Sequence, residues 1–155
     1  MRGVVDLIAL RYPSFCFGGE ISSDIIPVFH FHNVSREYLE PYINYLAEND
    51  YKTIVSDELE AFVIRGIKKN PRNVVLCFDD AWRSLWTVVY PLLTEYGMKA
   101  IAYAIPGRIE EAKEVRASGK EGENGSLFVT WPELMKMKNS GVIDVQAHTC
   151  LLYTS

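Results

Sequence analysis

A regular alternation of short apolar segments with stretches of helical periodicity most constrains how this chain can fold. Five apolar segments are predicted to be strands, at residues 25–31, 51–55, 74–78, 99–105 and 142–147. Between them, apolar residues recur at the 3.6-residue spacing of helices that bury one face. Strands and helices that alternate in this way form parallel sheets through right-handed crossovers. The sequence therefore predicts an α/β fold with about five parallel strands, in either a doubly wound sheet or part of a (β/α) barrel.

Local signals mark where the predicted helices begin and which face each of them buries. Ser35, Ser56 and Thr130 are predicted N-caps, and Glu133 would complete a capping box with Thr130. The positions expected to face the core are Leu39, Tyr42, Ile43 and Leu46 in the first helix and Leu59, Phe62, Val63 and Ile67 in the second. The strand at 74–78 is apolar throughout, which is typical of a strand buried on both faces.

Charge and hydropathy exclude several function classes. The 155 residues carry 16 Lys and Arg against 20 Asp and Glu, a net charge of −4. Because there is no basic excess to neutralise phosphates, the composition argues against a nucleic-acid partner. No apolar run approaches the ~18 residues of a membrane span, so none is predicted. Asp6 interrupts the short apolar stretch near the N-terminus, which makes a poor signal peptide and leaves the cytoplasm and the cell envelope both open as locations.

Polar residues of the metal-ligating types follow three of the predicted strands. His30 and His32 end the first strand and share one face of it, Asp79 and Asp80 end the third, and His148 ends the fifth. The carboxyl ends of parallel strands meet at one edge of a sheet, where ligands bind. We therefore expect these side chains to converge on one site.

The adjacent carboxylates of Asp79 and Asp80 carry the chemical argument. Two like charges close together raise each other's pKa unless a cation or hydrogen bonds offset them. A divalent metal would do so, with one carboxylate as its ligand and the other as a general base. The residues themselves leave a second interpretation open, in which Asp79 caps the following helix and Asp80 is solvated. Phosphatases of the haloacid dehalogenase type need an aspartate where this chain has Ala81, which weakens a phosphoryl-transfer hypothesis built on Asp79.

The segment around these carboxylates resembles the first motif of the polysaccharide deacetylase family, the NodB-homology domain of carbohydrate esterase family 4 type. That motif is an apolar strand followed by Thr-Phe-Asp-Asp-Gly, and here Cys77 stands at the Thr and Ala81 at the Gly. Residues 142–149 resemble the start of the second motif, His-Ser/Thr-x-x-His. The segments similar to other parts of the family, in the family's order, are 27–34, 99–106 and 130–134.

The resemblance implies a distorted (β/α) barrel of NodB type that removes N- or O-acetyl groups from an acetylated polysaccharide or oligosaccharide. Asp79 would be the general base, and Asp80 and His148 would ligate a divalent metal. Zinc is chemically suitable, and cobalt or another divalent ion could serve. The third ligand is expected four residues after His148, where this chain has Leu152. His32 is expected to line the site rather than to ligate.

Trp82 and Arg83 are the other expected substrate contacts, through stacking and hydrogen bonding to sugar. For Trp82, packing at the rim of the site is an equal alternative. Two further functions stay open at this stage. One is a non-catalytic carbohydrate-binding barrel that has lost its ligands, and the other is the phosphoryl-transfer enzyme that uses Asp79.

The resemblance also divides the chain. Residues 1–24 are expected to be a lead-in segment, and 25–149 the N-terminal part of a polysaccharide deacetylase domain. The barrel is therefore expected to be incomplete, and the fragment as written to be inactive until the rest of the domain is present. Residues 150–155 can be encoded by a DNA string that resembles the transposon end used in library preparation. We therefore expect these six residues to be a non-native tail.

Overall fold

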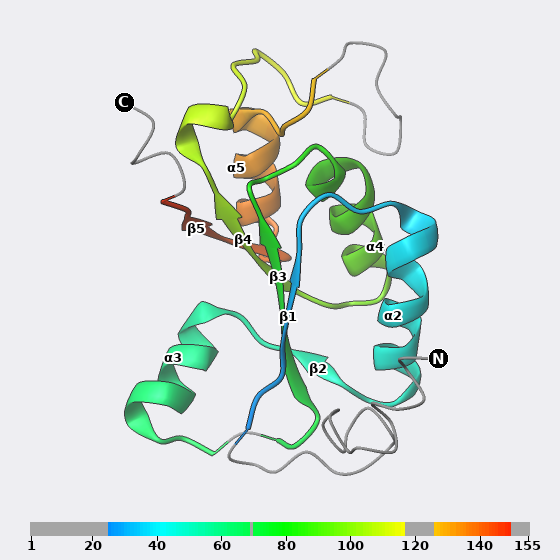
Figure 1. Cartoon of the computed structure of the whole chain (residues 1–155), viewed down its shortest axis with the longest axis vertical. Helices are drawn as coiled ribbons and strands as arrows, with labels where there is room; N and C mark the ends of the chain where they lie inside the picture. The colour runs from blue at the N-terminus through cyan, green and yellow to red at the C-terminus, as the bar shows by residue number, and fades with distance from the viewer. Residues whose placement is uncertain (1–24, 69, 117–125, 150–155) are drawn as a thin grey trace, which may run out of the picture.

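The computed structural model of the chain describes residues 25–68, 70–116 and 126–149 (Figure 1). Its elements are β1 (Val28–Phe31), α2 (Arg36–Glu48), β2 (Lys52–Thr53), α3 (Ser56–Arg65), β3 (Asn73–Asp79), the π-helical turn η2 (Leu85–Val89), α4 (Tyr90–Glu95), β4 (Ala100–Ala104), the 3₁₀ turn η3 (Pro106–Arg108), α5 (Trp131–Asn139) and β5 (Ile143–Ala147). The alternation predicted from the sequence is confirmed. No helix in the described part of the chain is long and apolar enough to cross a membrane. The expected segments 1–24 and 150–155 lie outside the described residues.

The strands form one parallel sheet with the order β1-β3-β4-β5. The short strand β2 pairs in parallel with the first two residues of β3. β1 and β5 lie at opposite edges of this sheet, so the described strands form an open sheet and not a closed barrel (Figure 1). This arrangement confirms the α/β class and the parallel pairing, and it agrees with an incomplete barrel.

The central strand β3 is buried on both faces, as its apolar sequence predicts. Val74, Leu76 and Phe78 belong to a large cluster that also contains the buried faces of α2, α4 and α5. Val75 and Cys77 point the other way, into a smaller cluster with Ile54 and Ile101. We call the face that carries this smaller cluster the inner face of the sheet. Its side chains lead along β3 to Asp79, so the inner face is where the candidate site begins.

The first helix largely follows the prediction. The Ser35 hydroxyl accepts a hydrogen bond of 3.3 Å from the Tyr38 N–H, and Leu39, Ile43 and Leu46 are buried. Tyr42 is the exception, because half of its surface is exposed and its ring packs on Tyr38 along the outside of the helix.

The predicted buried face of the second helix is wrong in two positions. Val63 is 68% exposed and Ile67 is 48% exposed, and no residue of α3 is fully buried. The reason is that α3 meets the inner cluster near its start, through Leu59, and runs away from the sheet (Figure 1).

The N-cap position belongs to Val55, and Ser56 instead donates its hydroxyl and its N–H to the Asp144 carboxylate on β5.

The turn after β3 has a backbone that L-residues rarely adopt. Asp80 and Ala81 have φ angles of 68° and 56°, in the left-handed region. The Ala81 carbonyl accepts a hydrogen bond of 3.1 Å from the Val129 N–H, and the Arg83 N–H donates to the Leu127 carbonyl over 2.8 Å. Hydrogen bonds from the segment that precedes α5 therefore stabilise the turn that follows the two carboxylates.

We predict that Ala81→Gly changes stability little. The substitution relieves a left-handed backbone that costs roughly 1–2 kcal/mol, against the loss of one fully buried methyl group worth about 0.8 kcal/mol. The matched control is Ala104→Gly in β4, where the methyl is also buried and the backbone is ordinary strand. Urea unfolding would compare the two variants. An equal loss of stability in both would show that the turn carries no strain.

Candidate active site

The strand register builds the site in rows across the inner face. Asp79 of β3 pairs with Tyr103 of β4, which pairs with Gln146 of β5. Phe31 pairs with Phe78, so the next residue of β1, His32, falls level with Asp79. Parallel strands keep such rows on one face because side chains alternate with period two. The row ends the sheet at its carboxyl edge.

Asp79 lies near two histidines, His30 of β1 and His32 just after it. Its Oδ2 atom is 3.8 Å from His30 Nδ1 and 3.9 Å from His32 Nε2. The carboxylate is largely buried, with 17% of its side chain exposed, whereas both imidazoles are more than half exposed. These separations are ion-pair contacts, longer than hydrogen bonds, and the exposed imidazoles approach the oxygen from the solvent side.

Asp80 has different partners from Asp79. Its Oδ1 atom is 3.8 Å from His148 Nε2, and its Oδ2 atom is 3.5 Å from an Arg108 guanidinium nitrogen. His148 is held in place because its N–H donates to the Ala104 carbonyl over 2.8 Å, which continues the ladder between β4 and β5. Each of the two adjacent carboxylates thus has its own basic partners at the carboxyl edge of the sheet.

The donor chemistry of Asp80 and His148 fits a divalent metal in part. Two donors about 2.0–2.2 Å from a zinc ion lie within about 4 Å of each other, and these two are 3.8 Å apart. Within residues 25–68, 70–116 and 126–149, no group of three His, Cys, Asp or Glu side chains could hold an ion. The pair can therefore supply two ligands, and the described residues contain no complete set. Position 152, where a third ligand was expected, lies outside them.

Two groups beneath Asp79 complete the inner face. Burial, with a smaller effect of the nearby Asp79 charge, raises the pKa of the Cys77 thiol to about 11. Burial also raises the pKa of Tyr103, and Cys77, Asp79 and Asp144 add to the effect. Both groups are neutral at pH 7, so they form a polar but uncharged floor below the carboxylate.

Tyr103 and Gln146 were not singled out in the sequence, although the period-two alternation of their strands could have found them once the register was known. Arg108 gave no such signal, because it belongs to the turn η3 after β4 and reaches Asp80 only through the path of that turn.

Of the expected sugar contacts, His32 lies with Asp79, whereas Trp82 and Arg83 lie beyond the turn. The Trp82 ring packs on the Phe128 ring with ring centroids 4.8 Å apart. The Arg108 guanidinium lies over the Phe128 ring, 5.3 Å from its centroid. Both interpretations of Trp82 stay open, because Trp82 packs on Phe128 and also lines a cleft next to the turn. Arg83 lines a cleft next to the turn.

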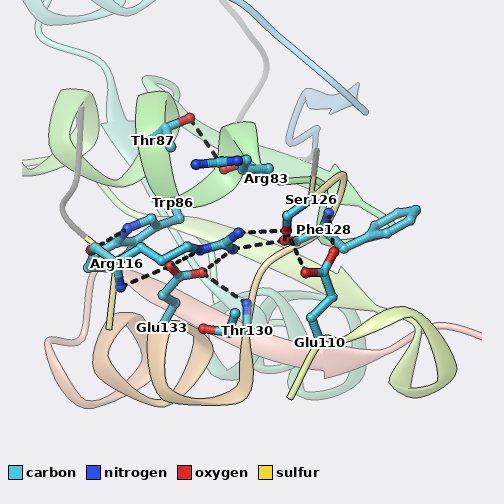
Figure 2. A network of polar contacts seen from close by, with 9 residues as sticks. All are labelled: Arg83, Trp86, Thr87, Glu110, Arg116, Ser126, Phe128, Thr130 and Glu133. Atoms are coloured by element: carbon cyan, nitrogen blue, oxygen red, sulfur yellow. Dashed lines mark hydrogen bonds and ion pairs between the residues drawn. The ribbon is translucent and has the colours of Figure 1, made fainter. Parts of the chain in front are cut away.

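A buried ion pair anchors the segment that carries Phe128 (Figure 2). The Arg116 guanidinium donates two hydrogen bonds to Glu133, of 2.6 Å from Nε to Oε1 and 2.7 Å from a terminal nitrogen to Oε2. Glu133 is completely buried. Its carboxylate also accepts a hydrogen bond of 2.9 Å from the Thr130 N–H, which forms one half of the predicted capping box. In the other half, the Thr130 hydroxyl is buried and lacks a partner among the described residues.

The same arginine connects the two ends of the loop between β4 and α5. It donates to the Ser126 hydroxyl over 2.5 Å and to the Phe128 carbonyl over 2.9 Å, and its own carbonyl accepts from Trp86 Nε1 over 3.1 Å (Figure 2). The Glu110 carboxylate accepts from the Ser126 hydroxyl and from the Phe128 N–H. This network fixes the segment that pairs with the turn at Asp80 and Ala81, so it acts on the position of the site.

The open parallel sheet and the carboxylate–imidazole pairs at its carboxyl edge define an α/β protein with a candidate site at that edge. The comparison with known families then gives the family. Residues 66–153, more than half of the chain, match the family model described as polysaccharide deacetylase. The chain belongs to the polysaccharide deacetylase family.

Two curated relatives are similar over most of this chain. A poly-beta-1,6-N-acetyl-D-glucosamine N-deacetylase of Escherichia coli (strain K12) is 27% identical over 122 residues, which are 77% of this chain and 18% of that protein. A protein of the same name from Staphylococcus aureus (strain MRSA252) is 25% identical over 118 residues, which are 76% of this chain and 37% of that protein. The chain therefore spans less than half the length of these relatives.

Solved structures of similar fold include IcaB from Ammonifex degensii, with a TM-score of 0.66 and 20% identity over 84% of this chain and 54% of that chain. The Streptococcus pyogenes deacetylase PplD in complex with acetate has a TM-score of 0.63 and 20% identity over 80% of this chain and 56% of that chain. These likenesses agree with the expected NodB-type fold.

The Arg116–Glu133 pair leads to a prediction on pH. Burial would raise the pKa of Glu133, but the hydrogen bonds from Arg116 and Thr130 outweigh it and hold the pKa below the ordinary value of 4.5. A carboxyl whose pKa is lower in the folded state stabilises the fold above its unfolded pKa, and this contribution is lost as the pH falls through the folded pKa. Glu133→Gln is expected to cost about 3 kcal/mol at pH 7, since Arg116 loses its charged partner.

Urea unfolding between pH 7 and pH 2.5 would measure this effect. The difference between the wild type and Glu133→Gln should shrink below pH 4.5, because the wild type loses the ion pair when Glu133 takes up a proton. Glu111→Gln removes an exposed carboxylate of the same loop and is the control. A difference that stays constant over the whole pH range would contradict the assignment.

Proposed function

We propose that the protein hydrolyses acetyl groups on a polysaccharide, with Asp79 as the general base. The observation that carries the proposal is the pairing of two adjacent carboxylates with separate imidazoles at the carboxyl edge of the sheet, in a chain that belongs to the polysaccharide deacetylase family. Because two relatives are named as N-deacetylases of poly-beta-1,6-N-acetyl-D-glucosamine, an N-acetylated amino sugar is the substrate we favour.

Asp79 is suited to the proton transfers. In the reaction, the oxygen of a water molecule bonds to the acetyl carbonyl carbon, the carbon–nitrogen bond breaks, and acetate and a free amine leave. Asp79 Oδ2 would take the proton that the water loses and pass it to the nitrogen as the amine leaves. Its contacts with His30 and His32 would keep this oxygen oriented. His32, which is 63% exposed, is placed to touch the sugar from the solvent side.

Asp80 and His148 would hold a divalent ion, and zinc is the ion we favour for a carboxylate and an imidazole. When bound, the ion would polarise the acetyl carbonyl and stabilise the negative charge that develops on its oxygen. Arg108 shares Asp80 with His148 and would keep the carboxylate turned toward the imidazole. Trp82 and Arg83 would extend the contact with the glycan beyond the turn.

Asp79→Asn is expected to lower acetate release by about 10²–10⁴-fold, the usual contribution of a general base. The metal content should stay unchanged, because Asp79 is not proposed as a ligand. Acetate release from an acetylated glycan and bound zinc would be measured on the same purified sample. Asp57→Asn, which removes an exposed carboxylate of α3, is the control. Undiminished activity in Asp79→Asn would remove Asp79 from the role of base.

Asp80→Ala and His148→Ala should lose metal first, since each removes a proposed ligand. Loss of one such ligand leaves a weak site, so an excess of zinc or cobalt should restore part of the activity of either variant. Titration of the metal into both variants, followed by acetate release, is the measurement. Full zinc occupancy in both variants without added metal would contradict the ligand assignment. Protein supplied with zinc that binds the glycan without hydrolysing it would support the carbohydrate-binding alternative.

A further inference from the structure

The segment that leads from β2 into α3 is bonded to three neighbouring strands of the sheet. Strand β2 pairs with the first residues of β3. The Thr53 hydroxyl also accepts a hydrogen bond of 2.6 Å from the Lys99 N–H, directly before β4. Three residues later, Ser56 donates to Asp144 of β5. The short segment 52–56 therefore connects β3, β4 and β5 near the ends where these strands begin.

The contact with β5 belongs to a closed group of three side chains, Ser56, Asp144 and Gln146, which we call the clasp. The Asp144 carboxylate accepts from the Ser56 hydroxyl and, over 3.0 Å, from the Ser56 N–H. Gln146 Nε2 donates to the Ser56 hydroxyl over 3.1 Å and to Asp144 Oδ1 over 3.0 Å. Each of the three side chains thus bonds to the other two, so the clasp fixes where β5 lies relative to the start of α3.

The start of α3 needs a partner from elsewhere in the chain. Its N-cap residue is Val55, whose side chain cannot accept a hydrogen bond. The first N–H groups of a helix have no acceptor within the helix, and a negative charge is favourable beside them. Asp144 supplies both an acceptor and a charge to Ser56, the first residue of α3. The start of α3 and the position of β5 therefore stabilise each other.

The clasp lies on the same face of β5 as His148. Asp144, Gln146 and His148 are two residues apart, and the ladder with β4 continues as far as the His148 N–H. In a flat sheet, β3 and β5 would lie roughly 9.5 Å apart, on either side of β4. Yet Asp80 Oδ1, just after β3, is 3.8 Å from His148 Nε2. A sheet that curls toward its inner face brings such side chains together.

The strand pairing alone leaves this curl weakly fixed at β5. Among the described strands, β5 lies at an edge of the sheet and pairs with β4 alone. A strand held along one edge can swing about that edge, because the ladder to its neighbour acts as a hinge. The clasp holds β5 at a second place, across the inner face. It is therefore the contact that can set the angle between β5 and the rest of the sheet.

We propose that Ser56 and Asp144 are positioning residues for the candidate metal pair, Asp80 and His148. The clasp keeps the sheet curled, and the curl keeps the two proposed ligands within reach of one ion. The inference rests on the proposed function, and it deepens that function by adding residues that act on the ligands without touching the ion. Loss of a residue that orients a ligand typically lowers metal affinity by about 10–100-fold. Because the clasp acts through β5, we expect the lower end of this range.

Two measurements on the full chain test the inference. The first is the nuclear Overhauser effect between the His148 ring protons and the Asp80 side chain, which reports their separation without any metal. The second is the Kd of zinc, measured by competition with a chromogenic chelator. Asp144→Ala should weaken the Overhauser effect and raise the zinc Kd roughly tenfold. Ser56→Ala should act in the same direction, although it changes no charge.

Asp144→Asn separates the geometry of the clasp from the charge of the carboxylate. Its amide oxygen can still accept from Ser56, so the Overhauser effect and the zinc Kd should stay close to those of the wild type. The matched control is Ser35→Ala, which removes a hydroxyl from the start of α2, in the helical layer on the other face of the sheet. It should leave both measurements unchanged.

The outcomes separate this inference from the proposed function. An Overhauser effect or a zinc Kd that is unchanged in both alanine variants overturns the inference and leaves the deacetylase proposal intact. Equal losses in Asp144→Asn or in Ser35→Ala also overturn it, because charge or general stability would then explain the effect. A weaker Overhauser effect in the alanine variants of a protein that binds no zinc supports the positioning of the two side chains and overturns their assignment as ligands. If Asp144→Ala does not fold, as judged by its circular dichroism, Ser56→Ala, which loses a single hydroxyl, decides the test.

Discussion

The burial of β3 on both faces is the constraint on which the rest of this structure depends. Its even-numbered side chains, such as Leu76, hold the helical layer, and its odd-numbered ones, such as Cys77, form the inner face. Because β1 and β4 flank this strand and β2 also pairs with it, three of the other four strands take their register from it. Asp79 is its last residue, so the packing that orders the sheet also sets the height and direction of the proposed base.

The site then depends on how the chain leaves β3. Two consecutive non-glycine residues, Asp80 and Ala81, adopt a left-handed backbone. At this turn Asp79 meets His30 and His32, while Asp80 meets His148 and Arg108. The strained turn persists because the segment before α5 hydrogen-bonds to it. That segment is in turn anchored by the Arg116–Glu133 pair at the far side of the loop.

Much of this arrangement follows from local sequence signals. Where a prediction from the sequence was wrong, the reason is physical. The strands and the first helix could be predicted because hydrophobic periodicity and capping act over a few residues. Val63 and Ile67 continue a good helical stripe, yet they are exposed, because a stripe indicates an apolar face and says nothing about which element covers it. The sequence indicated Glu133 as a helix-capping residue. Its hydrogen bond with Arg116 joins positions 17 residues apart, and no local pattern in either segment predicts it.

By itself the sequence determined the order of strands and helices, the burial of the central strand, and the placement of Asp79, Asp80 and His148 at strand ends. These are consequences of side-chain periodicity and of the shared carboxyl edge of parallel strands. Only the tertiary structure decided which carboxylate meets which imidazole, that Arg108 reaches Asp80, and that Arg83 faces a cleft of its own. Those contacts depend on turn geometry and on the path of a long loop, and both are set by interactions between residues distant in the chain.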